Sequence, residues 1–174
     1  MACDFIDNGR LEPCRDSVGG IKEVYFVQFG TLGGYTDTDD VLDTFTDSPT
    51  AYRYEVRGNS SFTQNIQSSD ETGTTAFEQV VELTLKKLSA DDHKKVKLLA
   101  HGRPHVIVKD QNDNFFLAGL DNGLVVTGGT IVTGAAMSEL SGYTLTFTGM
   151  EKVPANFIDD TTLAGAGFTV PTVS

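Results

Sequence analysis

The sequence has no tryptophan, only two cysteines, and far fewer basic than acidic residues. Its 13 Lys and Arg against 24 Asp and Glu give a formal net charge of −11. This balance argues against a surface that grips nucleic acid, because such binding requires Lys and Arg to neutralise phosphates. No window approaches the roughly 18 apolar residues that a membrane-spanning helix needs, so we expect a soluble protein with no membrane partner.

Both cysteines, Cys3 and Cys14, lie in the first segment of the chain. Their spacing fits no zinc-binding pattern. No basic region followed by an apolar region marks a secretory signal, so we expect free thiols. A disulfide in the mature product of a longer precursor stays open as an alternative.

Glycine and threonine recur throughout the 174 residues, which favours strands and turns over a helical bundle. A chain of this length is sufficient for one core, so we expect a single domain over residues 1–174. The run 20–29 is apolar on both faces, which predicts a strand covered on both sides. The fold class that we expect is mainly β, an antiparallel β-sandwich or barrel with one flanking α-helix.

Three further strands are predicted with one polar face each. Residues 51–57 and 61–67 alternate around Gly58-Asn59, which predicts a hairpin. The stretch 141–152, "SGYTLTFTGMEK", places Tyr143, Leu145 and Phe147 on one face and threonines on the other. Its apolar face should pack on the core, and its threonine face should meet solvent, a lumen or a neighbouring subunit.

The helix is predicted over residues 89–102. Ser89 with Asp92 three residues later is typical of a helix start, and Gly102 is typical of an end. Because the apolar stripe of Val96 and Leu99 is narrow, the helix should pack on a sheet or across its open end.

Three other segments show no sustained periodicity. Residues 1–19 form an N-terminal segment, and residues 30–50 are expected to be a long acidic loop. Residues 153–174 carry two prolines and scattered apolar side chains, which indicates a C-terminal arm. The arm either contacts another subunit or packs on its own domain.

We expect no catalytic, cofactor-binding or metal-binding residues and no cofactor. Asp110, Asn112, Asn114 and Asp121 match four places of a calcium loop, but Phe115 replaces the required glycine, so an Asp- and Asn-rich turn explains them better. The three histidines, His93, His101 and His105, lie outside any nucleophile motif. The glycine-rich runs lack the phosphate-loop pattern.

The front run "VYFVQFG" and the ending "GYTLTFTGMEKVPANF" resemble the tail tube proteins of long-tailed bacteriophages. The resemblance implies a structural, non-enzymatic virion protein, assembled in the host cytoplasm into the tail. It implies hexameric rings that stack into a tube and contact other tail proteins, with genomic DNA passing through the lumen without specific binding. The acidic balance suits such a passage, because like charges repel.

Two other functions stay open at the level of sequence. A tail terminator, a baseplate protein or a head-to-tail ring protein would show a similar composition, and fold analogy does not separate them. A small β-sandwich hydrolase or a ligand-binding module is the alternative from another class.

Overall fold

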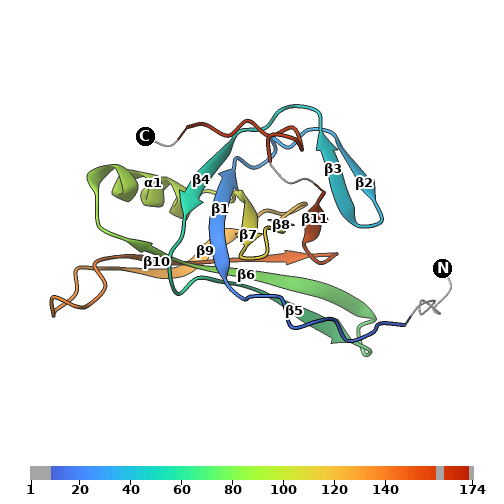
Figure 1. Cartoon of the computed structure of the whole chain (residues 1–174), viewed down its shortest axis with the longest axis horizontal. Coiled ribbons are helices and arrows are strands. Elements are labelled where there is room, and N and C mark those ends of the chain that lie inside the picture. Colours follow the sequence, from blue (N-terminus) through green and yellow to red (C-terminus); the bar gives the residue numbers. More distant parts are fainter. Residues whose placement is uncertain (1–8, 160–162, 173–174) are drawn as a thin grey trace.

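The computed structural model describes residues 9–159 and 163–172, and within them the chain forms two β-sheets and one helix (Figure 1). The strands of the larger sheet are β1 (Ile21–Val27), β2 (Tyr35–Thr38), β3 (Val41–Phe45), β4 (Ala51–Glu55), β7 (His105–Asp110), β8 (Phe115–Ala118) and β11 (Asn156–Ile158). They lie in the order β2-β3-β11-β8-β7-β1-β4. The smaller sheet has the order β5-β6-β10-β9. Its strands are β5 (Ser61–Ser69), β6 (Thr74–Lys86), β9 (Val125–Val132) and β10 (Gly142–Glu151).

The two sheets pack face to face around the main core. Phe26 of β1 meets Phe147 of β10 with ring centroids 5.3 Å apart, which links the larger sheet to the smaller one. Tyr143, Leu145 and Phe147 are buried, whereas Thr144, Thr146 and Thr148 lie on the other face of β10. The predicted fold class, a mainly β sandwich with one helix, is therefore confirmed.

A second core covers the opposite face of the larger sheet. Tyr25 and Val27 of β1 point into it, as do Ile107 of β7 and Leu117 of β8. The hairpin β2–β3, at the far end of the same sheet, and the C-terminal segment, residues 163–172, contribute the other side chains of this core. Strand β1 is thus buried on both faces, as the sequence predicts.

The predicted long loop over residues 30–50 is wrong, because the structure folds most of it into the hairpin β2–β3. Thr38 pairs with Val41, so Asp39 and Asp40 form a two-residue turn. Both have positive φ, 53° and 63°, as a type I′ turn requires. Aspartate adopts this conformation more readily than most residues, but the neighbouring acidic residues hide the turn in the sequence.

The prediction of an arm over residues 153–174 is also wrong for the part that the structure describes. Strand β11 lies inside the larger sheet, antiparallel to β8 and parallel to β3. Leu163, Ala166 and Phe168 are buried in the second core. Of the two alternatives, the segment packs on its own domain; residues 160–162 and 173–174 lie outside the described residues.

The predicted hairpin around Gly58-Asn59 does not form. Strand β4 pairs with β1 at the edge of the larger sheet, whereas β5 pairs with β6 in the smaller sheet. Residues 56–60 therefore carry the chain from one sheet to the other. Ser60 supports this crossing, because its hydroxyl accepts a hydrogen bond from the backbone N–H of Thr84 at 3.1 Å.

Helix α1 (Ala90–His101) confirms the predicted helix, and its caps are those expected. The Ser89 hydroxyl accepts from the N–H of Asp92, and the N–H of Gly102 donates to the Leu99 carbonyl. Val96 is buried in the main core, and Leu99 packs against it. Neither α1 nor any other part of the described chain is a helix long and apolar enough to cross a membrane.

Candidate functional site: a polar sheet face between two open edges

The outward face of the smaller sheet is almost entirely polar. The strand register places Ser61, Glu82 and Thr146 side by side across three strands, followed by Thr63, Val80 and Thr148. We call this surface the polar face; its residues are Ser61, Thr63, Asn65, Gln67, Glu78, Val80, Glu82, Thr84, Lys86, Val125, Thr130, Val132, Thr144, Thr146, Thr148 and Met150. The threonine side of β10 thus points outward, where other molecules can reach it.

Side chains on the polar face bond to one another across the strands. Glu78 accepts a hydrogen bond from the Asn65 amide at 3.1 Å. The hydroxyls of Thr130 and Thr144 pair between β9 and β10. The charged groups on the face are the carboxylates of Glu78 and Glu82 and the ammonium group of Lys86.

Both outer edges of the smaller sheet are open, in the sense that no strand of the described residues pairs with the free side of β5 or β9. Ile66 of β5 is 70% exposed, and Ile131 of β9 is 53% exposed. Proteins that stay monomeric usually protect such edges with charge, proline or a covering segment. Each of these two edges thus carries an exposed isoleucine, and helix α1 lies next to β9.

The three histidines do not come together. His93 and His101 lie on α1 and are exposed, and the His93 ring lies 6.3 Å from that of Tyr143. His105 begins β7 and is 2% exposed. His93 and His101 thus lie on the helix that the sequence predicts over residues 89–102.

His105 holds loops together. Its Nδ1 donates to the carbonyl of Gly119 at 2.5 Å, and its Nε2 accepts from the N–H of Gly30 at 3.2 Å. The ring stacks on Phe29, and the Arg103 guanidinium lies 3.9 Å from the centroid of that same Phe29 ring. Burial lowers the pKa of His105, although the Gly119 hydrogen bond opposes this effect. Both ring nitrogens of His105 therefore make hydrogen bonds to the backbone of loops.

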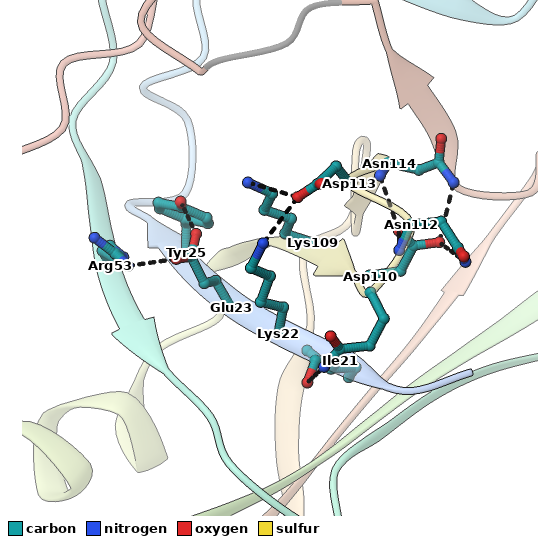
Figure 2. A network of polar contacts seen from close by, with 11 residues as sticks. Ile21, Lys22, Glu23, Tyr25, Arg53, Lys109, Asp110, Asn112, Asp113 and Asn114 are labelled. Atoms are coloured by element: carbon teal, nitrogen blue, oxygen red, sulfur yellow. Dashed lines mark hydrogen bonds and ion pairs between the residues drawn. The ribbon is translucent and has the colours of Figure 1, made fainter. Parts of the chain in front are cut away.

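The calcium-loop pattern is an Asp-centred turn (Figure 2). One carboxylate oxygen of Asp110 accepts from the N–H groups of Asn112 and Asn114 at 2.9 and 2.8 Å, and the other accepts from their side-chain amides. Burial raises the pKa of Asp110, but these hydrogen bonds outweigh it and lower the pKa overall. Asp121 lies beyond β8, where its N–H donates to Glu151. The prediction of a turn is confirmed.

Figure 2 also shows two ion-pair clusters on the same side of the larger sheet. Lys22 and Lys109 both reach Asp113 at 3.1 Å, which lowers the pKa of that exposed carboxyl. Glu23, which is buried, binds the Arg53 guanidinium and accepts from the Tyr25 hydroxyl at 2.5 Å. Burial raises the pKa of Tyr25, and the hydrogen bond to Glu23 raises it further. These contacts join β1 to the neighbouring strand β4 and to the turn that follows β7, so the clusters stabilise the sheet.

Several buried polar residues were not predicted from the sequence, and two of them accept hydrogen bonds from the backbone of the β8–β9 connection. Gln79 of β6 accepts from the N–H of Gly119 at 2.8 Å, and Glu151 of β10 accepts from the N–H of Asn122 at 2.8 Å. Burial raises the pKa of Glu151. The strand period places both on the inward face, which is the one signal that could have found them.

Residues 9–159 and 163–172 contain no cluster of metal-ligating side chains. No three His, Cys, Asp or Glu side chains of these ranges gather as metal ligands. Cys14 is exposed with a free thiol, and Cys3 lies outside the described residues.

Searches against protein-family models, curated proteins and solved structures find no match for the chain.

Proposed function

We propose that the chain is a structural subunit of a phage tail tube, which builds rings by joining open edges of the smaller sheet. The observation that carries this proposal is the pair of open edges, β5 and β9, on opposite sides of one sheet. The resemblance of the sequence to tail tube proteins supports the same function. The stacked hexameric ring, the location in the virion tail and the contacts with other tail proteins rest on that resemblance.

Edge pairing of this kind is head-to-tail. If β5 of one copy pairs with β9 of the next, the same contact repeats around a ring. Once the ring closes, the smaller sheets have no open edge left. Pairing would satisfy the outward N–H and C=O groups of both strands, and it would cover Ile66 and Ile131. The smaller sheets would then form one continuous barrel.

The polar face is the natural lining of such a barrel. Threonine hydroxyls and amides are neutral, and the carboxylates of Glu78 and Glu82 repel phosphate. A DNA molecule leaving the virion would therefore slide along the wall without being held. The apolar face of each sheet stays in the core of its own subunit, where Phe147 and Val81 pack.

The proposal is tested by electron microscopy and analytical ultracentrifugation of the purified protein over a range of concentrations. The wild-type chain should form rings that stack into open-centred tubes. Ile66→Lys and Ile131→Lys should each prevent ring closure, because a charge on either edge opposes strand pairing. His101→Lys, at an exposed position on α1, is the matched control and should assemble normally.

Three results decide between the candidate functions. Tubes that disappear in both edge variants support the proposal. Single closed rings that never stack would favour a tail terminator or another joining ring protein. A wild-type chain that stays monomeric at every concentration, or edge variants that assemble like the wild type, would contradict it.

A further inference from the structure

An apolar groove of about 1010 Å³ lies between α1 and the edge strand β4. Its walls include Tyr52 and Tyr54 from β4, Leu98 from α1, and Phe29 beneath Arg103. Tyr52 and Leu98 are more than half exposed although both are large and apolar. The groove thus presents aromatic and aliphatic surface that is typical of a binding site for an extended peptide.

One wall of the groove is an open strand edge. The N–H of Val56 donates to the carbonyl of Lys22 in β1, whereas the N–H of Ala51 donates away from β1 to the carbonyl of Thr169. Because neighbouring residues of a strand alternate in the direction of their hydrogen bonds, Arg53 and Glu55 point their backbone groups away from β1. No strand of the described residues pairs with them there.

The C-terminal segment begins to cover this edge and then stops. Thr169 bonds with both Pro49 and Ala51, which forms a short parallel bridge at Thr50. Pro171 follows, and it has no N–H to continue the pairing. Among residues 9–159 and 163–172, the edge is therefore covered at its start and unpaired at Arg53 and Glu55.

The N-terminal segment, residues 9–19, does not pack on its own domain as the C-terminal segment does. Every one of these residues is exposed, and Leu11 is 92% exposed. Its base is fixed, because the Asn112 amide bonds both the N–H and the carbonyl of Val18 at 2.9 and 2.8 Å. Figure 1 shows the segment leaving the molecule on the side away from α1 and β4, the two elements that form the groove. The N-terminal segment therefore points away from the groove of its own chain.

We propose that the N-terminal segment of one copy binds the groove of a second copy as an added strand beside β4. Leu11 and Pro13, which share a side in an extended chain, would cover Tyr52 and Leu98. The charges of the segment and of the groove are complementary. In an antiparallel strand that places Leu11 opposite Tyr54, Arg10 would lie opposite Glu55 and Glu12 opposite Arg53, so each charge would meet its opposite. The inference rests on the proposed self-assembly but uses a different surface.

The first test measures binding of a fluorescent synthetic peptide of residues 9–18 to the full chain carrying Leu11→Asp, whose own segment is impaired. Fluorescence polarisation under reducing conditions should show saturable binding. A second substitution, Leu98→Asp, should weaken it by about tenfold or more, since a buried leucine contact is lost. His101→Asp on the same helix makes the same change in charge outside the groove and should leave the affinity unchanged.

Two results of this test would overturn the inference. One is the absence of saturable binding up to millimolar peptide. The other is equal binding to the Leu98→Asp and His101→Asp chains, which would place the peptide elsewhere. Circular dichroism of each variant separates loss of the groove from loss of the fold.

A second test uses mixing of full-length variants. Leu11→Asp lacks a working segment and Leu98→Asp lacks a working groove, so each alone should lose this contact. Mixed, they should regain one contact, between the segment of the Leu98→Asp chain and the groove of the Leu11→Asp chain. With Ile66→Lys added to every chain to block edge pairing, ultracentrifugation should therefore detect association in the mixture and not in either variant alone. Equal association in all three samples would contradict a segment-to-groove contact.

The Ile66→Lys chain separates this inference from the proposed ring. If peptide binding persists in that chain while rings are absent even from the wild type, the ring fails and the groove stands. If rings form but the peptide does not bind, the ring stands and the groove inference fails.

Discussion

Phe45 of β3 and Phe168 of the C-terminal segment pack with ring centroids 4.4 Å apart. The neighbouring backbone is joined as well, because the N–H of Phe45 donates to the carbonyl of Ala166 at 2.9 Å. Gly167 allows this approach, since a Cβ atom there would lie 2.3 Å from the Phe45 carbonyl oxygen. The pair joins two segments distant in sequence within the second core.

Phe168→Ala should destabilise the fold by about 3–5 kcal/mol, the usual cost of removing a buried phenylalanine ring. Phe168 is 3% exposed, so the variant leaves a cavity beside Phe45. Urea unfolding followed by circular dichroism measures the loss. Phe157→Ala is the matched control, because Phe157 is 47% exposed, and its loss should be clearly smaller. Equal losses would mean that the second core contributes little to stability.

Deleting residues 153–174 should prevent folding instead of merely weakening assembly. The deletion removes β11 from inside the larger sheet and exposes the side chains that Leu163, Ala166 and Phe168 cover. Far-ultraviolet circular dichroism and proteolysis of the truncated chain measure the outcome. A folded, protease-resistant product would contradict the packing of this segment on its own domain.

Stability should decrease as the pH falls below about 6.5, the ordinary pKa of histidine, because of His105. Burial lowers its pKa in the folded state, so the unfolded chain binds more protons between that lower pKa and 6.5. Protonation would also break the hydrogen bond from the N–H of Gly30. The free energy of unfolding, measured between pH 7.5 and 5, should fall.

The His105→Gln variant checks the assignment. It should be less stable than the wild type at neutral pH by about 1–3 kcal/mol, because buried backbone groups lose partners. It should also lose part of the pH dependence. The double variant His93→Gln, His101→Gln removes only exposed rings and should keep that dependence. A pH profile that moves with the exposed histidines would refute the role of His105.

Asp110→Ala should destabilise the fold by about 1–3 kcal/mol, because the turn loses the acceptor of its N–H bonds from Asn112 and Asn114. Asp121→Ala changes another member of the calcium pattern and should have little effect, since Asp121 is exposed. Since the pKa of Asp110 is lowered, its contribution is present above the ordinary value of 3.8 and is lost as the pH falls below it.

Millimolar calcium should leave the melting temperature of the wild-type chain unchanged. Both Asp110 oxygens already accept hydrogen bonds, so they are not free to bind a cation. A calcium-dependent increase that Asp110→Ala abolishes would show that the turn can rearrange into a metal site. Magnesium at the same ionic strength serves as the control.

The sequence predicted those elements whose pattern repeats several times. Strand β10 alternates over its whole length, and α1 carries both cap residues, so each could be located before its partners were known. Strand β11 has three residues, which is too short for a period to show. The pairing of β4 with β1 instead of β5 depends on contacts distant in sequence, which the Gly58-Asn59 turn signal does not contain.

The candidate site was predicted in part for the same reason. Alternation revealed the threonine face of β10, but the extent of the polar face required the register with β6 and β9. That β5 and β9 are edges follows from the strand order, which sequence periodicity does not encode. The groove beside β4 joins a helix, a strand and the C-terminal segment, so it existed in no single stretch of sequence.

The position of β11 has a consequence for folding during synthesis. This strand lies between β3 and β8, yet the ribosome makes it after all the other strands of the larger sheet. Until β11 leaves the ribosome, the hairpin β2–β3 has no strand to join it to β8, β7, β1 and β4. A nascent chain therefore holds an incomplete sheet with an apolar face exposed, and it depends on late, long-range pairing to finish. The larger sheet can therefore be completed only after its last strand, β11, has been synthesised.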